Sequence, residues 1–109
     1  MKTNKVQFKQ QAEFCKFMAN PKRLEILFLL KNKEMCVEDI AENMEINIPN
    51  VSQHLAVMKN KGIVEVRRDG VKMYYKLSSQ KIIQACMIMK ELMTEQLNKK
   101  SKSLNLKKG

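Results

Sequence analysis

The chain contains few of the residue types on which catalytic sites depend. Its 109 residues include one histidine, three glycines, two prolines and no tryptophan. We find no nucleophile–base pair and no glycine-rich phosphate loop, so we do not expect an enzyme. Aromatic residues make up 6% of the chain and form no stacking platform of the kind that reads single-stranded RNA.

Long apolar runs are also absent. The longest, Ile26–Leu30 and Ala85–Met89, have five residues each, whereas a helix needs roughly 20 apolar residues to cross a bilayer. The N-terminal residues include no apolar signal segment. We therefore expect a cytoplasmic protein that has no membrane partner. In that compartment its three cysteines stay reduced, and structural disulfides are not expected.

Positive charge is plentiful and unevenly distributed. The chain has 21 basic and 11 acidic residues, a net charge of +10. Segment 46–77 holds six basic and two acidic residues, whereas segment 34–45 holds five acidic residues and no basic one. A local excess of positive charge suits an anionic partner, and here nucleic acid is a better candidate than a membrane. Segment 46–77 is the candidate surface for that partner.

Residues 47–62, NIPNVSQHLAVMKNKG, are typical of a short helix with one polar side. Asn47 can cap the helix, and a proline is tolerated so early because the first backbone N–H groups have no helical partner. Val51, Leu55 and Met58 recur at steps of four and three, which predicts a buried stripe. Gly62 stands where a helix ends in the left-handed conformation.

A basic hairpin follows this helix directly. Segments 63–68 and 71–77 are predicted strands, joined by Asp69-Gly70, a strong signal for a two-residue turn. Three cations cluster around that turn: Arg67, Arg68 and Lys72. Tyr74 and Tyr75 point to opposite faces of their strand. One should pack on the core, and the other can offer its hydroxyl group to a DNA backbone.

The rest of the chain predicts four more helices. Their expected ranges are 6–19, 21–32, 37–44 and, after Ser78–Ser79, a long last helix to about residue 98. Residues 99–109 form a basic tail without apolar periodicity, which we expect to be disordered. The fold class is therefore mainly α with a small β-hairpin (α+β), in one domain spanning residues 1–98. A helix followed by a basic hairpin is the sequence form of a winged helix-turn-helix.

Three stretches together resemble a known family. ANPKRLEIL, VEDIAENM and VSQHLAVMKNKGIVEVRRDGVKMYYKL are similar to the arsenic-repressor (ArsR/SmtB) family of bacterial winged-helix repressors, over about residues 8–93. The resemblance implies a homodimer formed through the first and last helices. It also implies binding to an inverted-repeat operator in double-stranded DNA, and release when an inducer binds.

The candidate DNA contacts lie on the predicted recognition helix and the wing. Polar groups on the helix can bind base edges, and cations on the wing can bind phosphates. The candidates are Asn50, Ser52, Gln53, His54, Lys59, Arg67, Arg68, Lys72 and Tyr75. His54 is the only histidine, and its SQHL context favours a DNA-facing or helix-positioning role over a metal ligand, because no nitrogen or sulfur ligand follows at a suitable spacing.

The sequence identifies a candidate inducer site less clearly than it identifies the candidate DNA contacts. The family's metalloid site resembles a Cys-Val-Cys arrangement, but this chain has Cys36-Val37-Glu38, which leaves that site incomplete. The family's zinc site on the last helix needs histidines, which are absent there. Cys15 and Cys86 fall on the apolar sides of the first and last predicted helices. These two cysteines, together with Cys36, are candidates for a thiol sensor of a soft metal, a metalloid, or a reactive sulfur or oxidant species.

Two alternatives remain open. The three cysteines can simply be small core residues, which is the commonest place for a free thiol. In that case the chain is an inducer-independent winged-helix DNA-binding protein, either a constitutive repressor or an architectural protein.

Overall fold

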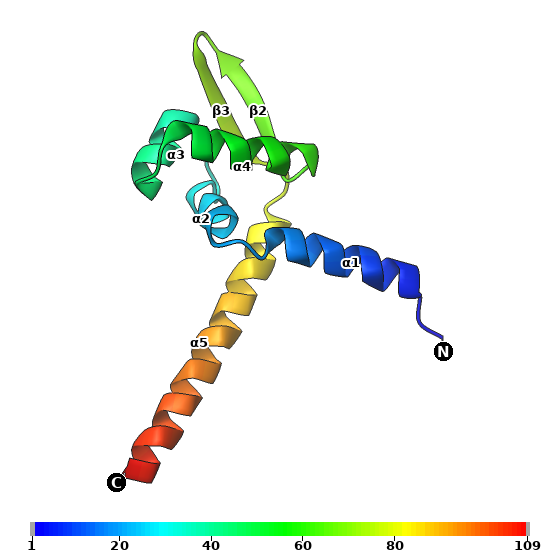
Figure 1. Ribbon diagram of the computed structural model, residues 1–109, viewed down its shortest axis with the longest axis vertical. Helices are drawn as coiled ribbons and strands as arrows, with labels where there is room; N and C mark the ends of the chain where they lie inside the picture. Colours follow the sequence, from blue (N-terminus) through cyan, green and yellow to red (C-terminus); the bar gives the residue numbers. More distant parts are fainter. Residues whose placement is uncertain (1, 109) are drawn as a thin grey trace. The chain divides into compact units, whose positions relative to one another are not determined.

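The computed structural model describes the backbone of residues 2–108 and the side chains of residues 2–102. The chain divides into two compact units, and the boundary between them lies at Ser79–Gln80. The first contains four helices and three strands: α1 (Lys5–Met18), α2 (Pro21–Leu29), β1 (Met35–Cys36), α3 (Val37–Met44), α4 (Ile48–Asn60), β2 (Val64–Asp69) and β3 (Lys72–Leu77) (Figure 1). The second contains α5 (Lys81–Lys108). Five helices and a β-hairpin wing confirm the predicted fold class.

The core of the first unit is built from the apolar stripes of α2, α3 and α4. Val51, Leu55 and Met58, predicted to form the buried side of α4, are all fully buried. They are joined by residues from the other helices and the sheet, namely Ile26, Leu27, Leu30, Cys36, Ile40, Ala41, Met44, Ile63, Val64 and Leu77. Because three helices and the base of the wing share this core, the wing and α4 are held in one body.

Side-chain caps set where α2 and α4 begin. The Asn20 side chain accepts hydrogen bonds from the backbone N–H groups of Lys22 and Arg23, at 3.0 and 3.2 Å. The Asn47 side chain accepts one from the N–H of Asn50 at 2.8 Å. Both asparagines satisfy donors that have no partner within the helix. The predicted start of α4 after Asn47 is thus confirmed.

The turn between α3 and α4 depends on one left-handed residue. Glu45 ends α3 at φ 57°, and the N–H of Ile46 then donates to the carbonyl of Ala41 at 3.2 Å. This closes the helix and reverses the chain within the few residues before α4. The helix-turn-helix is therefore α3, the turn at 45–47, and α4.

The sheet differs from the prediction in two respects. It has three antiparallel strands in the order β1-β3-β2, because Met35 and Cys36 pair with Tyr75 and Tyr74. The sequence predicted no strand at Met35 and Cys36, since two residues are too few to show a strand alternation. The hairpin turn is Gly70-Val71 rather than Asp69-Gly70, because Asp69 pairs with Lys72. Gly70, at φ 61°, takes the first turn position, where a type II′ turn requires glycine.

The helix ends also differ in places. α2 stops at Leu29 instead of residue 32, because the chain must turn at Asn32, which has a positive φ of 56°, to reach β1. α5 continues to Lys108, past the predicted end at residue 98, because lysine and leucine favour helix even without burial. The division into a domain at 1–98 and a tail at 99–109 stays a prediction, and Gly109 lies outside the described residues.

Gly62 offers a direct test of the end of α4. Its φ is +75°, and a Cβ added there would meet no atom within 4 Å. Gly62→Ala therefore adds backbone strain without a clash, and we expect it to lower the free energy of unfolding by about 1 kcal/mol. Gly62→Asn should cost less, because asparagine tolerates the left-handed region.

Urea unfolding of both variants and the wild type at one protein concentration measures these values. An alanine variant as stable as the wild type would show that Gly62 does not need its left-handed conformation.

Candidate nucleic-acid interface

The outward side of α4 is set by its buried side. Since the stripe of Val51, Leu55 and Met58 faces the core, residues about half a turn away must face solvent. Pro49, Gln53 and Asn60 are indeed exposed. Of the predicted DNA contacts on this helix, Gln53 and Lys59 are exposed, whereas Asn50 and Ser52 are half-buried at the flanks. The exposed residues of α4 therefore include the polar Gln53, Lys59 and Asn60 as well as the apolar Ile48, Pro49 and Ala56.

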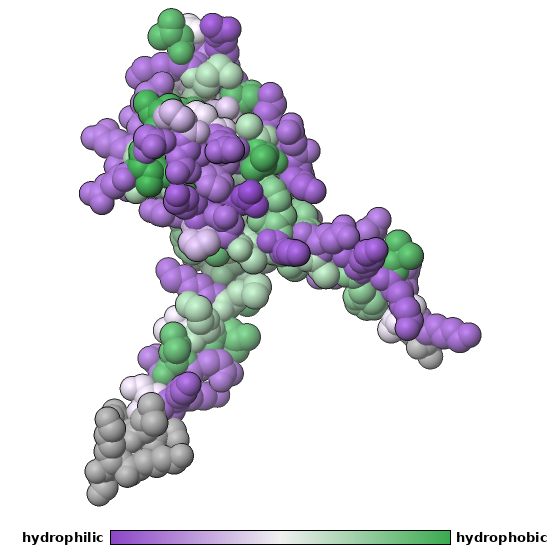
Figure 2. Space-filling model, in the orientation of Figure 1, coloured by the Kyte–Doolittle hydropathy of each residue, from purple (hydrophilic) through white to green (hydrophobic). Residues whose placement is uncertain are grey.

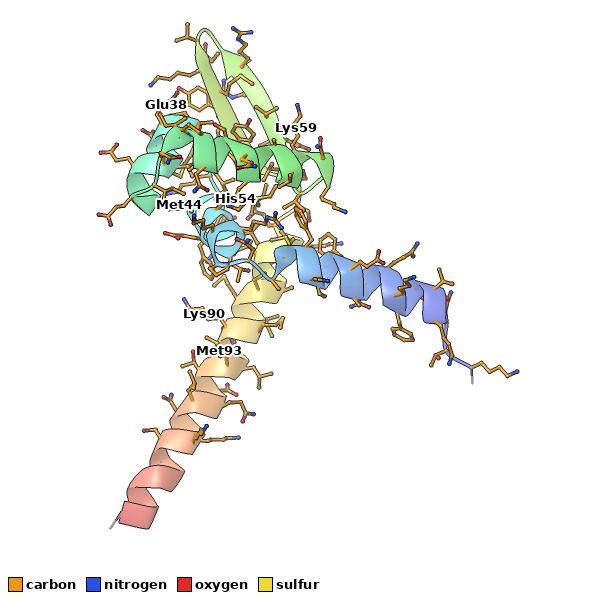
Figure 3. All side chains as sticks on the ribbon, viewed as in Figure 1. Glu38, Met44, His54, Lys59, Lys90 and Met93 are labelled. Atoms are coloured by element: carbon orange, nitrogen blue, oxygen red, sulfur yellow. The ribbon has the colours of Figure 1, made fainter. Side chains whose placement is uncertain are left out.

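His54 lies on a different side of α4. It is half-buried, and Figure 3 shows it on the side of the helix that faces α2. Burial lowers the pKa of the imidazole, and the nearby cations Arg23 and Lys22 lower it further. The ring is thus kept neutral at neutral pH, and its surroundings favour packing against the start of α2. The predicted contact between His54 and DNA stays a prediction.

The two faces of the wing have different roles. Val64 and Leu77 pair with each other and are buried, and the alternate residues Val66 and Tyr75 share that face. The opposite face bears Glu65, Arg67, Asp69, Lys72, Tyr74 and Lys76. Tyr75 therefore lies on the core side of the sheet and Tyr74 on the outer side, although both rings are half-buried. This position gives Tyr75 a packing role, and its proposed contact with DNA stays untested.

Arg67 is held by a cluster that joins the wing to the body of the domain. Its guanidinium donates from Nε to both carboxylate oxygens of Glu34, at 2.9 and 2.8 Å, and from Nη2 to Oε1 at 2.6 Å. The same guanidinium lies over the ring of Tyr74, 4.5 Å from its centroid. Forked pairing with a carboxylate and stacking on a ring are the two contacts that suit arginine best. The sequence did not single out Glu34, because its partner is 33 residues away.

Other charges on the wing are also compensated. Lys76 lies 3.6 Å from a carboxylate oxygen of Glu65, and Arg67 lies 3.9 Å from one of Asp69. Among the described residues, Arg68 and Lys72 have no acidic partner within salt-bridge distance; Arg68 donates from Nε to the carbonyl of Gly70 at 3.1 Å. These two cations flank the hairpin turn, so the uncompensated positive charge of the wing is concentrated at its tip.

The three thiols are in different environments. Cys36 is buried at the start of α3, and burial is the main cause that raises the pKa of its thiol. Cys15 on α1 is exposed, and Cys86 on α5 is half-buried. Within residues 2–102, no three histidine, cysteine or acidic side chains come together as a metal site would require.

Comparison with known proteins identifies the family. Residues 20–66 match the family described as bacterial regulatory protein, arsR family. Over 92 residues the chain is 32% identical to the HTH-type transcriptional regulator Rv0081 of Mycobacterium tuberculosis, covering 84% of this chain and 81% of that protein. The chain belongs to the arsR family. Its members are regulatory proteins rather than enzymes, as the sequence predicted.

Solved structures of similar proteins share the fold. The crystal structure of Rv0081 matches with a TM-score of 0.78 at 29% identity, over 86% of this chain and 95% of that one. A homodimeric winged helix-turn-helix DNA-binding domain from Mycobacterium bovis matches with a TM-score of 0.72 at 33% identity, over 84% and 85% of the two chains.

Other relatives differ in length and in regulatory role. The Synechocystis transcriptional repressor SmtB homolog is 34% identical over 71% of this chain and 58% of its own. The Vibrio cholerae transcriptional activator HlyU is 36% identical over 62% of each chain. The matched part spans 39% of the M. tuberculosis regulator Rv0324 and 55% of KmtR from the same organism.

Among the described residues, no helix combines the length and the apolar character that crossing a membrane requires.

The Glu34–Arg67 pair predicts a pH response. The hydrogen bonds from Arg67 are the largest cause that lowers the pKa of Glu34, despite an opposing effect of burial. A carboxyl whose pKa is lower in the folded state stabilises the fold above its unfolded pKa, and the contribution is lost as pH falls through the folded pKa. In a carbon-detected NMR titration, Glu34 should titrate below the ordinary range of glutamate.

Arg67→Gln should return the Glu34 midpoint toward the ordinary range. Lys76→Gln is the matched control, because Lys76 is the smallest of the causes that lower this pKa. An unchanged Glu34 midpoint in Arg67→Gln would show that the pair does not persist in solution.

Proposed function

We propose that this arsR-family chain is a cytoplasmic, sequence-specific DNA-binding repressor that acts as a homodimer on an inverted-repeat operator. The observation that carries the proposal is the combination of polar groups on the exposed side of α4, Gln53 among them, with two cations at the wing tip that have no acidic partner among the described residues. A helix-turn-helix inserts such a helix into the major groove, and the wing-tip cations Arg68 and Lys72 then meet phosphates. Relatives include both a named repressor and a named activator.

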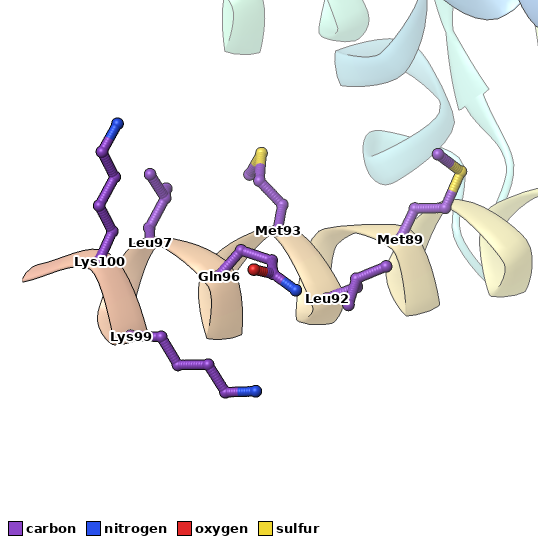
Figure 4. A pocket seen from close by; sticks show the side chains of 7 residues that line it. All are labelled: Met89, Leu92, Met93, Gln96, Leu97, Lys99 and Lys100. Atoms are coloured by element: carbon purple, nitrogen blue, oxygen red, sulfur yellow. The ribbon is translucent and has the colours of Figure 1, made fainter. Parts of the chain in front are cut away.

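The homodimer is supported by exposed apolar surface on α5. Met89, Met93 and Leu97 are more than half exposed and recur at steps of four along one side of the helix. With Leu92 and Gln96 they line a shallow groove on α5 that Lys99 and Lys100 complete (Figure 4). Figure 2 shows hydrophobic side chains exposed along this helix. Apolar area of this kind gains stability when a second copy covers it.

We assign distinct roles to the residues of the interface. Gln53 and Ser52 read base edges, with Asn50 beside them. Arg68 and Lys72 bind phosphates, as Lys59 does from the end of α4. Arg67 is already engaged by Glu34 and Tyr74, so its main role is to position the wing.

These roles predict different salt responses. Arg68→Ala and Lys72→Ala should each weaken binding to operator and random duplexes alike, and reduce the slope of log affinity against log salt by about one. Lys76→Ala is the matched control, because Lys76 is paired with Glu65, and it should leave the slope nearly unchanged. Gln53→Ala should instead lose discrimination between sequences, on the order of 1–3 kcal/mol.

Fluorescence anisotropy titrations at several salt concentrations measure both effects. If Arg68→Ala and Lys72→Ala keep the wild-type slope, the wing tip does not bind phosphates. If no duplex is preferred over random DNA, the proposed function fails.

Release by a thiol-reactive inducer is a second, separable part of the proposal. Thiolate is the reactive form of cysteine, and burial raises the pKa of Cys36, so this thiol is poorly suited to react. Cys15 is exposed on α1, and Cys86 lies on α5. We propose Cys15, together with Cys86, as the sensor of a soft metal, a metalloid, or a reactive sulfur or oxidant species. The competing possibility is inducer-independent binding with structural cysteines.

Operator binding by reduced protein, with and without trivalent arsenic or polysulfide, separates the two possibilities. Cys15→Ser should abolish release, whereas Cys36→Ser should still respond to the agent. A wild type that stays bound under both agents would favour the inducer-independent alternative. Release lost only in Cys36→Ser would place the sensor at the start of α3.

A further inference from the structure

Most side chains of α4 carry no charge. Between Ile48 and Met58 there is no lysine, arginine, aspartate or glutamate. The groups available to touch bases there are amides, a hydroxyl and apolar side chains. The nearest cations, Lys59 and Lys61, stand at the C-terminal end of the helix. Phosphate binding and base reading are thus carried by different parts of this interface.

Ile48 is the largest exposed apolar side chain of α4. It is the first residue of α4, directly after the capping Asn47, and it is 46% exposed. The cap holds the backbone at this point, because the Asn47 side chain accepts from the N–H of Asn50. Ser52 lies one turn further along the same side. A large aliphatic group is therefore presented at the end of the helix that enters the groove.

The chemistry of the major groove identifies a partner for such a group. The C5-methyl group of thymine is the apolar feature there, and aliphatic side chains contact it. Amide side chains such as that of Gln53 pair with adenine, whereas guanine is chiefly read by arginine or lysine. The available side chains therefore match A·T pairs and offer little for guanine.

We propose that Ile48 contacts a thymine methyl group in each half-site and so makes α4 a reader of A·T base pairs. This rests on the proposed DNA-binding function and goes beyond it, because it names the base and the atom that are recognised. The contact also accounts for the exposed isoleucine, since the surface that faces water in the free protein becomes buried in the groove.

Replacement of thymine by deoxyuridine tests the contact directly, because it removes only the methyl group. Duplexes are first recovered by the wild-type protein from random-sequence DNA, and each thymine is then replaced in turn. Each half-site should contain one thymine that responds. Replacing that single thymine by uracil should lower wild-type affinity about fourfold, the effect of one buried methyl group. Ile48→Ala should bind the thymine and uracil duplexes equally well.

Two further variants make the result specific. Val71→Ala removes an apolar side chain that is 93% exposed at the wing turn, and it should keep the wild-type response to uracil at the α4 thymine. Ile48→Gln should shift the preferred base at that position from thymine to adenine when selection is repeated. Circular dichroism checks that each variant is folded.

The outcomes separate the inference from the function on which it rests. If the wild type recovers no preferred sequence, the proposed function fails and the inference with it. If it recovers a preferred sequence but uracil affects wild type and Ile48→Ala equally at every thymine, or affects neither, the function stands and the contact by Ile48 is wrong. A guanine-rich selected half-site would also overturn the inference.

Discussion

The burial of one side of α4 is the constraint on which the interface depends. Val51, Leu55 and Met58 are fully buried, and burying each such side chain stabilises a fold by about 1.5–3 kcal/mol. Losing the burial of all three would cost an amount comparable with the roughly 5–15 kcal/mol by which a domain is stable. α4 therefore cannot rotate about its axis without losing that stability. The residues that face solvent on the opposite side, Gln53 among them, are consequently fixed in direction.

The wing shows why net charge is a poor guide to a binding surface. Segment 46–77 carries a clear excess of basic residues, but Arg67 and Lys76 are paired with acidic groups. Glu34 lies outside this segment, just before β1, and reaches the wing because β1 pairs with β3. On the wing itself, the positive charge that remains for an anionic partner is at Arg68 and Lys72. Ion pairing within the sheet thus concentrates the positive charge at the tip, and the Glu34–Arg67 contact fastens the wing to the body of the domain.

The two units differ in how their apolar residues are used. In the first unit, the apolar stripes of α2, α3 and α4 face one another and are buried. On α5, by contrast, Met89, Leu92, Met93 and Leu97 are exposed, although they recur with the same helical spacing. A single chain thus forms a packed reading unit and also presents a long helix with apolar surface. The homodimeric M. bovis domain shows that this fold forms a dimer in a relative.

Local sequence was sufficient for the elements whose signals lie within a few residues. The cap at Asn47, the buried stripe of α4, the left-handed Gly62 and the range of α3 all follow from short-range backbone and side-chain chemistry, and the structure confirms them. The hairpin was predicted, but its turn was misplaced by one residue, because the register depends on which cross-strand pairs form.

The sequence by itself determined the fold class and the buried side of α4, since periodicity and capping act within one or two turns of helix. Only the tertiary structure decided the rest. β1 exists because two residues find partners on β3, about forty positions away. Arg67 is engaged because Glu34 is brought beside it. His54 is turned toward α2, where burial, and then the nearby Arg23 and Lys22, lower the pKa of its imidazole. Each of these features depends on groups that are distant along the chain and become neighbours only when the core closes.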